Sequence, residues 1–212
     1  SNAGDPKTRA VPDGEHYLIT GSKAFITNAA VADVFLVTAR SESGVSAFIL
    51  DRGLPGFYIS PPDRKMGMHG SPASTRDFDG GRVPRSQMLG AEGRGFKAFA
   101  RALDLGRVNV AALIVGLAQA AYDAAAAYVK QREQFGRTIG SFQAVKHLCA
   151  EMVTELEPAR ALVWYAAHAF DSRPAEAPLM ACHAKAHLSE IGTQIVRTAT
   201  EDIPLHGGVV PT

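Results

Sequence analysis

The stretch Arg132-Glu-Gln-Phe-Gly-Arg-Thr-Ile-Gly-Ser-Phe-Gln143 separates two long helical patterns, and its Phe-Gly step indicates a turn between them. An arginine guanidinium and glutamine amides near helix ends are suited to bind a phosphate group and a nucleobase. A purely structural explanation is also open, in which this is a solvated turn and Gly136 ends the first helix. The two interpretations differ in function but agree on a helix, a turn and a second helix.

The sequence on both sides of this turn has helical periodicity. Residues 107–132 are apolar almost all round, which predicts a helix buried on most sides. Pro158 lies inside the apolar stripe of the following helix and should kink it or remove one backbone hydrogen bond. Long helices joined by short loops predict an antiparallel bundle, whose fourth helix is missing from the chain or supplied by another subunit. The predicted helices are residues 95–102, 107–132, 141–171 and 176–202.

The first part of the chain has the pattern of β-structure, with short β-branched and aromatic runs separated by Gly and Pro. Gly21-Ser22 is predicted to be a turn between two strands. Many short strands of this kind favour a small antiparallel barrel or sandwich. We therefore predict an α+β protein with a β-domain over residues 4–88 and a helical domain over residues 89–212. The predicted strands are residues 16–20, 24–27, 33–40, 46–50, 57–60 and 75–78, with residues 82–84 closing the sheet.

Composition excludes several classes of protein. Hydrophobic residues make up 46% and charged residues 20% of the 212 residues, as in ordinary globular chains. The net charge of +1, without a basic run, argues against a nucleic-acid partner. The longest apolar run, residues 110–118, is too short to cross a bilayer, so no membrane partner is expected. Cys149 and Cys182 fall inside helical patterns, which favours free thiols and a cytoplasmic location.

Several short motifs occur together in an order that resembles one enzyme family. They are Gly21-Ser-Lys-Ala-Phe-Ile-Thr-Asn28, Thr75-Arg76 … Val83-Pro84 … Gly93-Arg-Gly-Phe96, Leu103-Asp-Leu-Gly-Arg107, the loop of residues 132–143, and His206-Gly-Gly208. With a switch from strands to helices among them, the chain resembles the acyl-CoA dehydrogenases over nearly its whole length. The resemblance implies the middle β-domain and most of the C-terminal helical domain of that family, with FAD as cofactor.

For the flavin, the resemblance implies contacts from separate parts of the chain. Phe25 would form a flat apolar wall for the ring, and Thr27 would reach the ring edge. The loop of residues 132–143 would contact a dinucleotide bound mainly by a neighbouring subunit, and the Gly-Gly pair would allow close backbone approach near the adenine. Without the resemblance, residues 25–28 are a plain strand end and the Gly pair is a helix stop. The implied FAD contacts are Phe25, Ile26, Thr27, Arg132, Gln134, Phe135, Gln143, His206, Gly207 and Gly208.

Asp104 and Arg107 lie three residues apart, on one face where the long helix is predicted to begin. The resemblance places them against the pantetheine and acyl end of CoA, while the alternative is an ion pair at a helix start.

We expect no catalytic base in this chain. Most members of the family carry a Glu beyond the Gly-Gly loop, past Thr212, and the alternative position, one residue before the Arg, is Gly106. Removing an acyl α-proton requires a base. The family's N-terminal domain is also absent, so we expect the chain alone to bind flavin weakly and to be inactive.

The resemblance implies a role in fatty acid β-oxidation, converting a saturated acyl-CoA to the trans-2-enoyl-CoA. It also implies an electron-transfer flavoprotein as partner and assembly as a homodimer or homotetramer. An acyl-CoA oxidase or a flavin-dependent monooxygenase of the same fold remains an alternative. A non-catalytic helical interaction module is the alternative from a different class. No metal site is expected, because His183 and His187 lack an acidic third ligand in reach by sequence.

Overall fold

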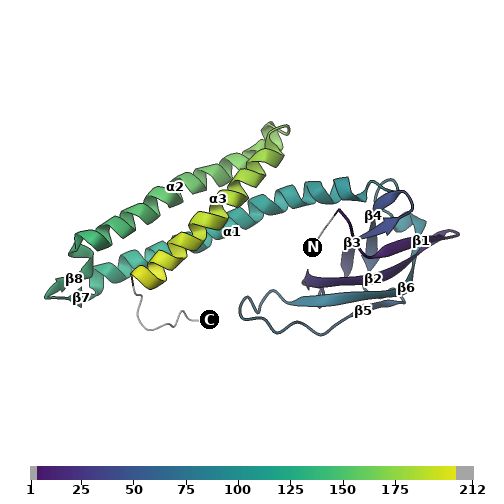
Figure 1. The fold of residues 1–212 in the computed structure, drawn as a ribbon, viewed down its shortest axis with the longest axis horizontal. Coiled ribbons are helices and arrows are strands. Elements are labelled where there is room, and N and C mark those ends of the chain that lie inside the picture. The colour runs from purple at the N-terminus through teal and green to yellow at the C-terminus, as the bar shows by residue number, and fades with distance from the viewer. Residues whose placement is uncertain (1–3, 204–212) are drawn as a thin grey trace. The chain divides into compact units, whose positions relative to one another are not determined.

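A computed structural model describes residues 4–203, and the chain divides into two compact units, residues 1–100 and 101–212. The first holds the six longer strands, and the second holds most of the helices and a short two-stranded hairpin (Figure 1). The fold class predicted from the sequence, a β-domain followed by long helices, is confirmed. The domain boundary after residue 88 stays a prediction.

From residue 4 onward, the β unit contains one six-stranded sheet with the order β4-β3-β1-β2-β6-β5. The β1–β3 pair is parallel and the other pairs are antiparallel, so the sheet is mixed rather than purely antiparallel. β1 was not predicted, and two predicted breaks are wrong because β2 and β6 each run without interruption. The strands are β1 (Arg9–Asp13), β2 (His16–Thr27), β3 (Val34–Ser41), β4 (Gly44–Asp51), β5 (Phe57–Ile59) and β6 (Ala73–Pro84).

Gly21 explains why β2 was expected to break. It pairs with Phe78 of β6 instead of forming a turn. Its φ is +134°, and a Cβ atom at this position would lie 2.8 Å from the Cα of Thr8. Glycine is therefore required here by close backbone approach inside a strand and not by a change of chain direction.

The sheet curves enough to enclose a core. β3 and β6 are separated in the strand order by β1 and β2, yet the Arg76 Cζ atom of β6 lies 3.4 Å from the ring centroid of Phe35 on β3. Strands so far apart in a flat sheet could not meet, which agrees with the predicted barrel or sandwich. The other fully enclosed apolar side chains include Tyr17, Ile19, Phe48, Leu50 and Val83.

Tyr17 provides a pH-dependent contribution to the stability of this unit. Its hydroxyl donates a hydrogen bond to Glu92 Oε2 at 2.9 Å. That bond is the main cause that holds the pKa of Glu92 below its ordinary value of 4.5. Because the folded pKa is depressed, the stabilisation is present above that value and is lost as the pH falls through the folded pKa.

We expect Tyr17→Phe to lower the stability near neutral pH by about 1 kcal/mol, since a buried acceptor loses its donor. The deficit should shrink as the pH falls from the ordinary pKa of Glu92 toward its depressed folded pKa, because the stabilisation of the carboxylate by Tyr17 is lost over this range. Urea unfolding at about pH 6 and about pH 3.5 measures this change. Tyr58→Phe, at an exposed residue of β5, is the control and should change neither value. A deficit that stays constant with pH would contradict the prediction.

Up to residue 203, the helical unit consists of three long helices and a small hairpin. α1 is continuous, so the predicted break between residues 102 and 107 is wrong. α2 returns antiparallel to α1 and α3 runs back again (Figure 1), and α2 continues through Pro158 without interruption. The elements are α1 (Gly95–Gln131), β7 (Glu133–Gln134), β8 (Arg137–Thr138), α2 (Gln143–Ser172), α3 (Ala177–Arg197) and a π-helical turn (Thr198–Asp202). Short 3-10 turns lie at Arg85–Gln87 and Ile139–Ser141.

One face of α1 is covered and another is open. Val108, Ala111 and Val115 lie in the core shared with α2 and α3, but Leu113 and Leu117 are 52% and 58% exposed. The prediction that this helix is buried on most sides is therefore wrong, whereas the expected open side of a three-helix bundle is present.

α1 is also long and apolar enough to cross a membrane by length and composition alone. Core helices of soluble proteins pass the same test, so this is weak evidence for a membrane span.

Candidate functional site

Phe25 lies near the end of β2, at a bulge opposite β6. Three steps along β2, from Lys23 to Ile26, match two steps along β6, from Arg76 to Ser74. The extra residue turns Phe25 outward, with its side chain 81% exposed and its backbone left-handed at φ +57°. A left-handed backbone is unfavourable for a bulky residue, and such conformations concentrate at functional sites. The bulge thus presents a flat aromatic surface that could pack against a planar ligand.

Ile26 and Thr27 follow as the last paired residues of β2, opposite Ser74 and Ala73. Thr27 is exposed and Ile26 is half-buried against the core. The strand then ends at Asn28, whose N–H donates to the Pro72 carbonyl at 2.7 Å. Phe25 and Thr27 are therefore both exposed near the end of β2.

The sequence Arg132–Gln143 is not an open loop: it contains a short hairpin, Glu133 to Thr138, followed by a 3-10 turn. α1 ends at Gln131, so the alternative in which Gly136 ends that helix is wrong. Phe135 and Gly136 are both left-handed, at φ +52° and +75°, and connect β7 to β8 in the manner of a type I′ turn. Gln134 lies in β7 and donates a side-chain bond to the Glu133 carbonyl at 2.8 Å.

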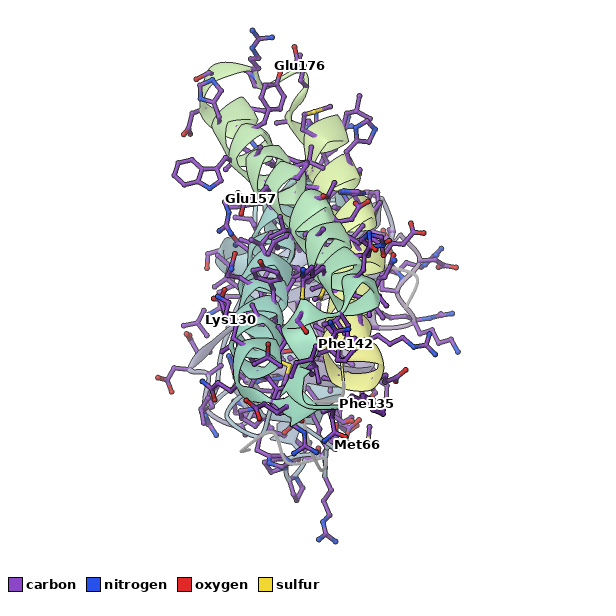
Figure 2. The ribbon with its side chains drawn as sticks, turned by 90° about the vertical axis from the view of Figure 1, so that its left-hand side faces the viewer. Met66, Lys130, Phe135, Phe142, Glu157 and Glu176 are labelled. Atoms are coloured by element: carbon purple, nitrogen blue, oxygen red, sulfur yellow. The ribbon has the colours of Figure 1, made fainter. Side chains whose placement is uncertain are left out.

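Phe135 at the turn of this hairpin is 91% exposed. Its ring meets that of Phe142 edge to face at 6.2 Å, and Figure 2 shows the two at the end of the helices far from Glu176. The Arg137 guanidinium lies 4.1 Å from the Phe142 ring centroid. Arg137 and Phe142 were not among the predicted site residues, and their partnership became apparent only with the hairpin. Together they fix the base of a projecting, partly cationic tip that also carries the half-buried Arg132 and the exposed Gln143.

Asp104 and Arg107 form an ion pair on α1, between Oδ1 and Nη1. The pair lies well inside the helix, which begins at Gly95, so the expected position at a helix start is wrong. Asp104 is 17% exposed and Arg107 is 39% exposed, which leaves the guanidinium accessible on one side. Gly106 lies between them in sequence, and a Cβ atom there would meet nothing within 4 Å.

The structure brings the predicted residues together in local groups: Phe25 to Thr27, Asp104 with Arg107, and Arg132 to Gln143. His206, Gly207 and Gly208 lie outside the described residues. Among residues 4–203, no three side chains of His, Cys, Asp or Glu lie where they could hold a metal ion. Cys149 and Cys182 are free thiols.

Comparison with known proteins assigns both units. The profile of the acyl-CoA dehydrogenase middle domain matches residues 1–80, and that of the acyl-CoA dehydrogenase C-terminal domain matches residues 93–209. The probable acyl-CoA dehydrogenase YngJ of Bacillus subtilis is 41% identical over 98% of this chain and 55% of its own length. The short-chain-specific acyl-CoA dehydrogenase of Clostridium acetobutylicum is 37% identical over the same shares.

A similar structure agrees with this assignment. Butyryl-CoA dehydrogenase from Megasphaera elsdenii superposes with a TM-score of 0.90 and 36% identity, over 96% of this chain and 54% of that one. The chain spans about 55% of the length of the curated relatives. The paired domain matches and the order of the two units show that the chain belongs to the acyl-CoA dehydrogenase family, of which it comprises the middle and C-terminal domains.

Proposed function

We propose that these two domains act in a flavoenzyme that oxidises a saturated, short-chain acyl-CoA to the trans-2-enoyl-CoA. The family is FAD-dependent, and the names of two similar proteins indicate short acyl chains. The observation that carries the proposal is the exposed, left-handed Phe25 on the rigid end of β2. A strained aromatic residue held outward has no packing role of its own and fits an isoalloxazine face.

In this proposal the residues of the chain position and do not react. FAD, when bound, would accept the hydride that leaves the acyl β-carbon. Phe25 would cover one face of the ring and exclude water, while Thr27 would donate a hydrogen bond at the ring edge. Asp104 and Arg107 would orient the acyl-CoA thioester. Arg132 and the hairpin tip around Phe135 would hold the dinucleotide of a second subunit, which requires at least a homodimer.

Removal of the α-proton needs a base. In the alternative family position for that base, on α1 one residue before Arg107, this chain has Gly106. Gly106 has no side chain, and its neighbour Asp104 is engaged with Arg107. We therefore propose that the chain of residues 1–212 alone does not turn over acyl-CoA. We further propose that the cytoplasmic full-length enzyme passes its electrons to an electron-transfer flavoprotein.

The experiment is an anaerobic titration of the full-length, flavin-loaded polypeptide with butyryl-CoA. Loss of the flavin absorbance, with reoxidation by an electron-transfer flavoprotein and slow reoxidation by air, is the expected result. An unchanged spectrum with both butyryl-CoA and palmitoyl-CoA would reject the proposal. Fast reoxidation by air alone would instead indicate an oxidase.

Phe25 offers a specific test of the flavin contact. We expect Phe25→Ala to weaken FAD binding roughly tenfold, because an aromatic stacking contact contributes about 0.5–1.5 kcal/mol. Phe25→Trp should bind as tightly as the unsubstituted enzyme. Quenching of FAD fluorescence on titration measures both. Tyr58→Ala removes another exposed aromatic side chain of the same sheet and should have no effect. Equal weakening by both alanine variants would show that Phe25 has no special role.

A further inference from the structure

Arg76 is a buried cation on an inner strand of the sheet, next to the edge strand β5. It lies on β6, pairs with Lys23 of β2 on one side and Ile59 of β5 on the other, and is 1% exposed. Its Cζ atom is 3.4 Å from the ring centroid of Phe35, 5.4 Å from that of Phe57 and 6.0 Å from that of Phe78. Aromatic faces attract a positive charge, and this accounts for part of its stability inside the core.

The N–H groups of the Arg76 guanidinium lack hydrogen-bond acceptors within the part of the chain that the structure describes. Among the described residues, neither Nε, Nη1 nor Nη2 of Arg76 has a hydrogen-bond partner. Ser74 lies two residues earlier on the same inward face of β6, and its Oγ is also buried without a partner. Aromatic rings replace conventional acceptors only weakly, so the donors of this face remain unsatisfied. Buried polar groups of native proteins are nearly always satisfied, by protein, water or an ion.

The charge is likewise uncompensated. Within residues 4–203, Arg76 forms no ion pair with a carboxylate. The nearby Arg52 adds a second positive charge, and its guanidinium donates to the carbonyls of Ala30 and Ala32 at 2.6 and 3.0 Å. Burial and Arg52 both lower the pKa of Arg76, but an arginine does not lose its proton in a protein. An unpaired buried charge is strongly destabilising, so a compensating negative charge would stabilise the folded chain.

We propose that the guanidinium edge of Arg76, together with the Ser74 hydroxyl, binds a small monovalent anion such as chloride inside the β unit. The size follows from the enclosure, because both side chains are almost inaccessible and three phenylalanine rings surround the cation. A phosphate or a carboxylate side chain would need an open path to the site. A water molecule could accept hydrogen bonds but would leave the positive charge uncompensated.

The test compares the thermal unfolding of the full chain in sodium chloride and in sodium gluconate at equal concentration. We expect a saturable rise of the midpoint in chloride, by about 5 °C, because a ligand that binds only the folded state stabilises it. Arg76→Met should abolish the difference between the two salts. Arg82→Met removes a mostly exposed arginine from the same strand and should leave the difference unchanged.

A second measurement uses the unsubstituted chain and does not depend on the folding of any variant. Crystals soaked in sodium bromide should show an anomalous peak at the edge of the Arg76 guanidinium. Bromide at surface positions alone would mean an adventitious ion only and would overturn the proposal. Equal midpoints in chloride and gluconate, or an undiminished chloride effect in Arg76→Met, would also overturn it.

Discussion

Replacing Gly95 by alanine is expected to destabilise the β unit by about 3 kcal/mol or more. Gly95 is the first residue of α1 and packs directly on β4. A Cβ atom there would lie 2.3 Å from the Ala47 nitrogen and 2.5 Å from the Ser46 carbonyl carbon. These are backbone atoms of a paired strand, so no side-chain rotation can relieve the overlap. The strand and the helix start must separate, which also strains the bond from Leu89 N–H to the Ala47 carbonyl.

Gly106 provides a matched control in the same helix. A Cβ atom at Gly106 would meet nothing within 4 Å, so Gly106→Ala should stabilise the chain by up to about 1 kcal/mol through helix propensity alone. Urea unfolding, followed by circular dichroism at wavelengths that report strand and helix separately, distinguishes the two variants. Similar small effects of both substitutions would mean that the contact between Gly95 and β4 can relax.

Leu156→Ala is expected to destabilise the helical unit by about 3 kcal/mol, within the range of 2–5 kcal/mol measured for such truncations in cores. Leu156 is fully buried in α2 and belongs to the cluster that joins all three helices. Many neighbouring side chains in this core are alanines, such as Ala111, Ala159 and Ala184. Alanine side chains are too short to reorient into the space that the leucine leaves. A cavity left by the leucine should therefore persist.

Leu117→Ala tests the same chemistry on the open side of α1. Leu117 is 58% exposed, so its truncation should change the stability by no more than about 0.5 kcal/mol. The loss of helical signal with temperature compares the two variants. An equal loss in both would indicate that the exposed face of α1 is covered in solution.

Much of the fold could be predicted from the sequence, because strand and helix periodicities are strong in this chain. Several of the errors lie at glycines. Gly21 and Gly106 both resemble breaks, but one serves close packing inside a strand and the other is tolerated within a helix. A glycine can form a turn, allow close backbone packing, or simply be tolerated inside a helix. The atoms around it in the folded chain determine which of these applies. β1 was missed because it has only five residues and contains Pro12.

The sequence identified candidate site residues, but it did not predict the bulge and the hairpin that position them. The motif around Phe25 could be related to a flavin contact by resemblance alone, since nothing in the tetrapeptide reveals a bulge. The hairpin of Glu133 to Thr138 has strands of two residues, too short for periodicity to indicate. Arg76 carried no warning in sequence, because an arginine in a strand is ordinarily placed on the solvent side.

The bulge in β2 also constrains how this strand can change over evolutionary time. Lys23 and Ile26 lie opposite inward-facing residues of β6, and two residues separate them instead of one. Loss of a single codon here would restore a regular ladder, but it would remove either the aromatic residue or the bulge that turns it outward. Substitutions at Ala24 should therefore be tolerated among descendants of this sequence, whereas insertions and deletions should be rare.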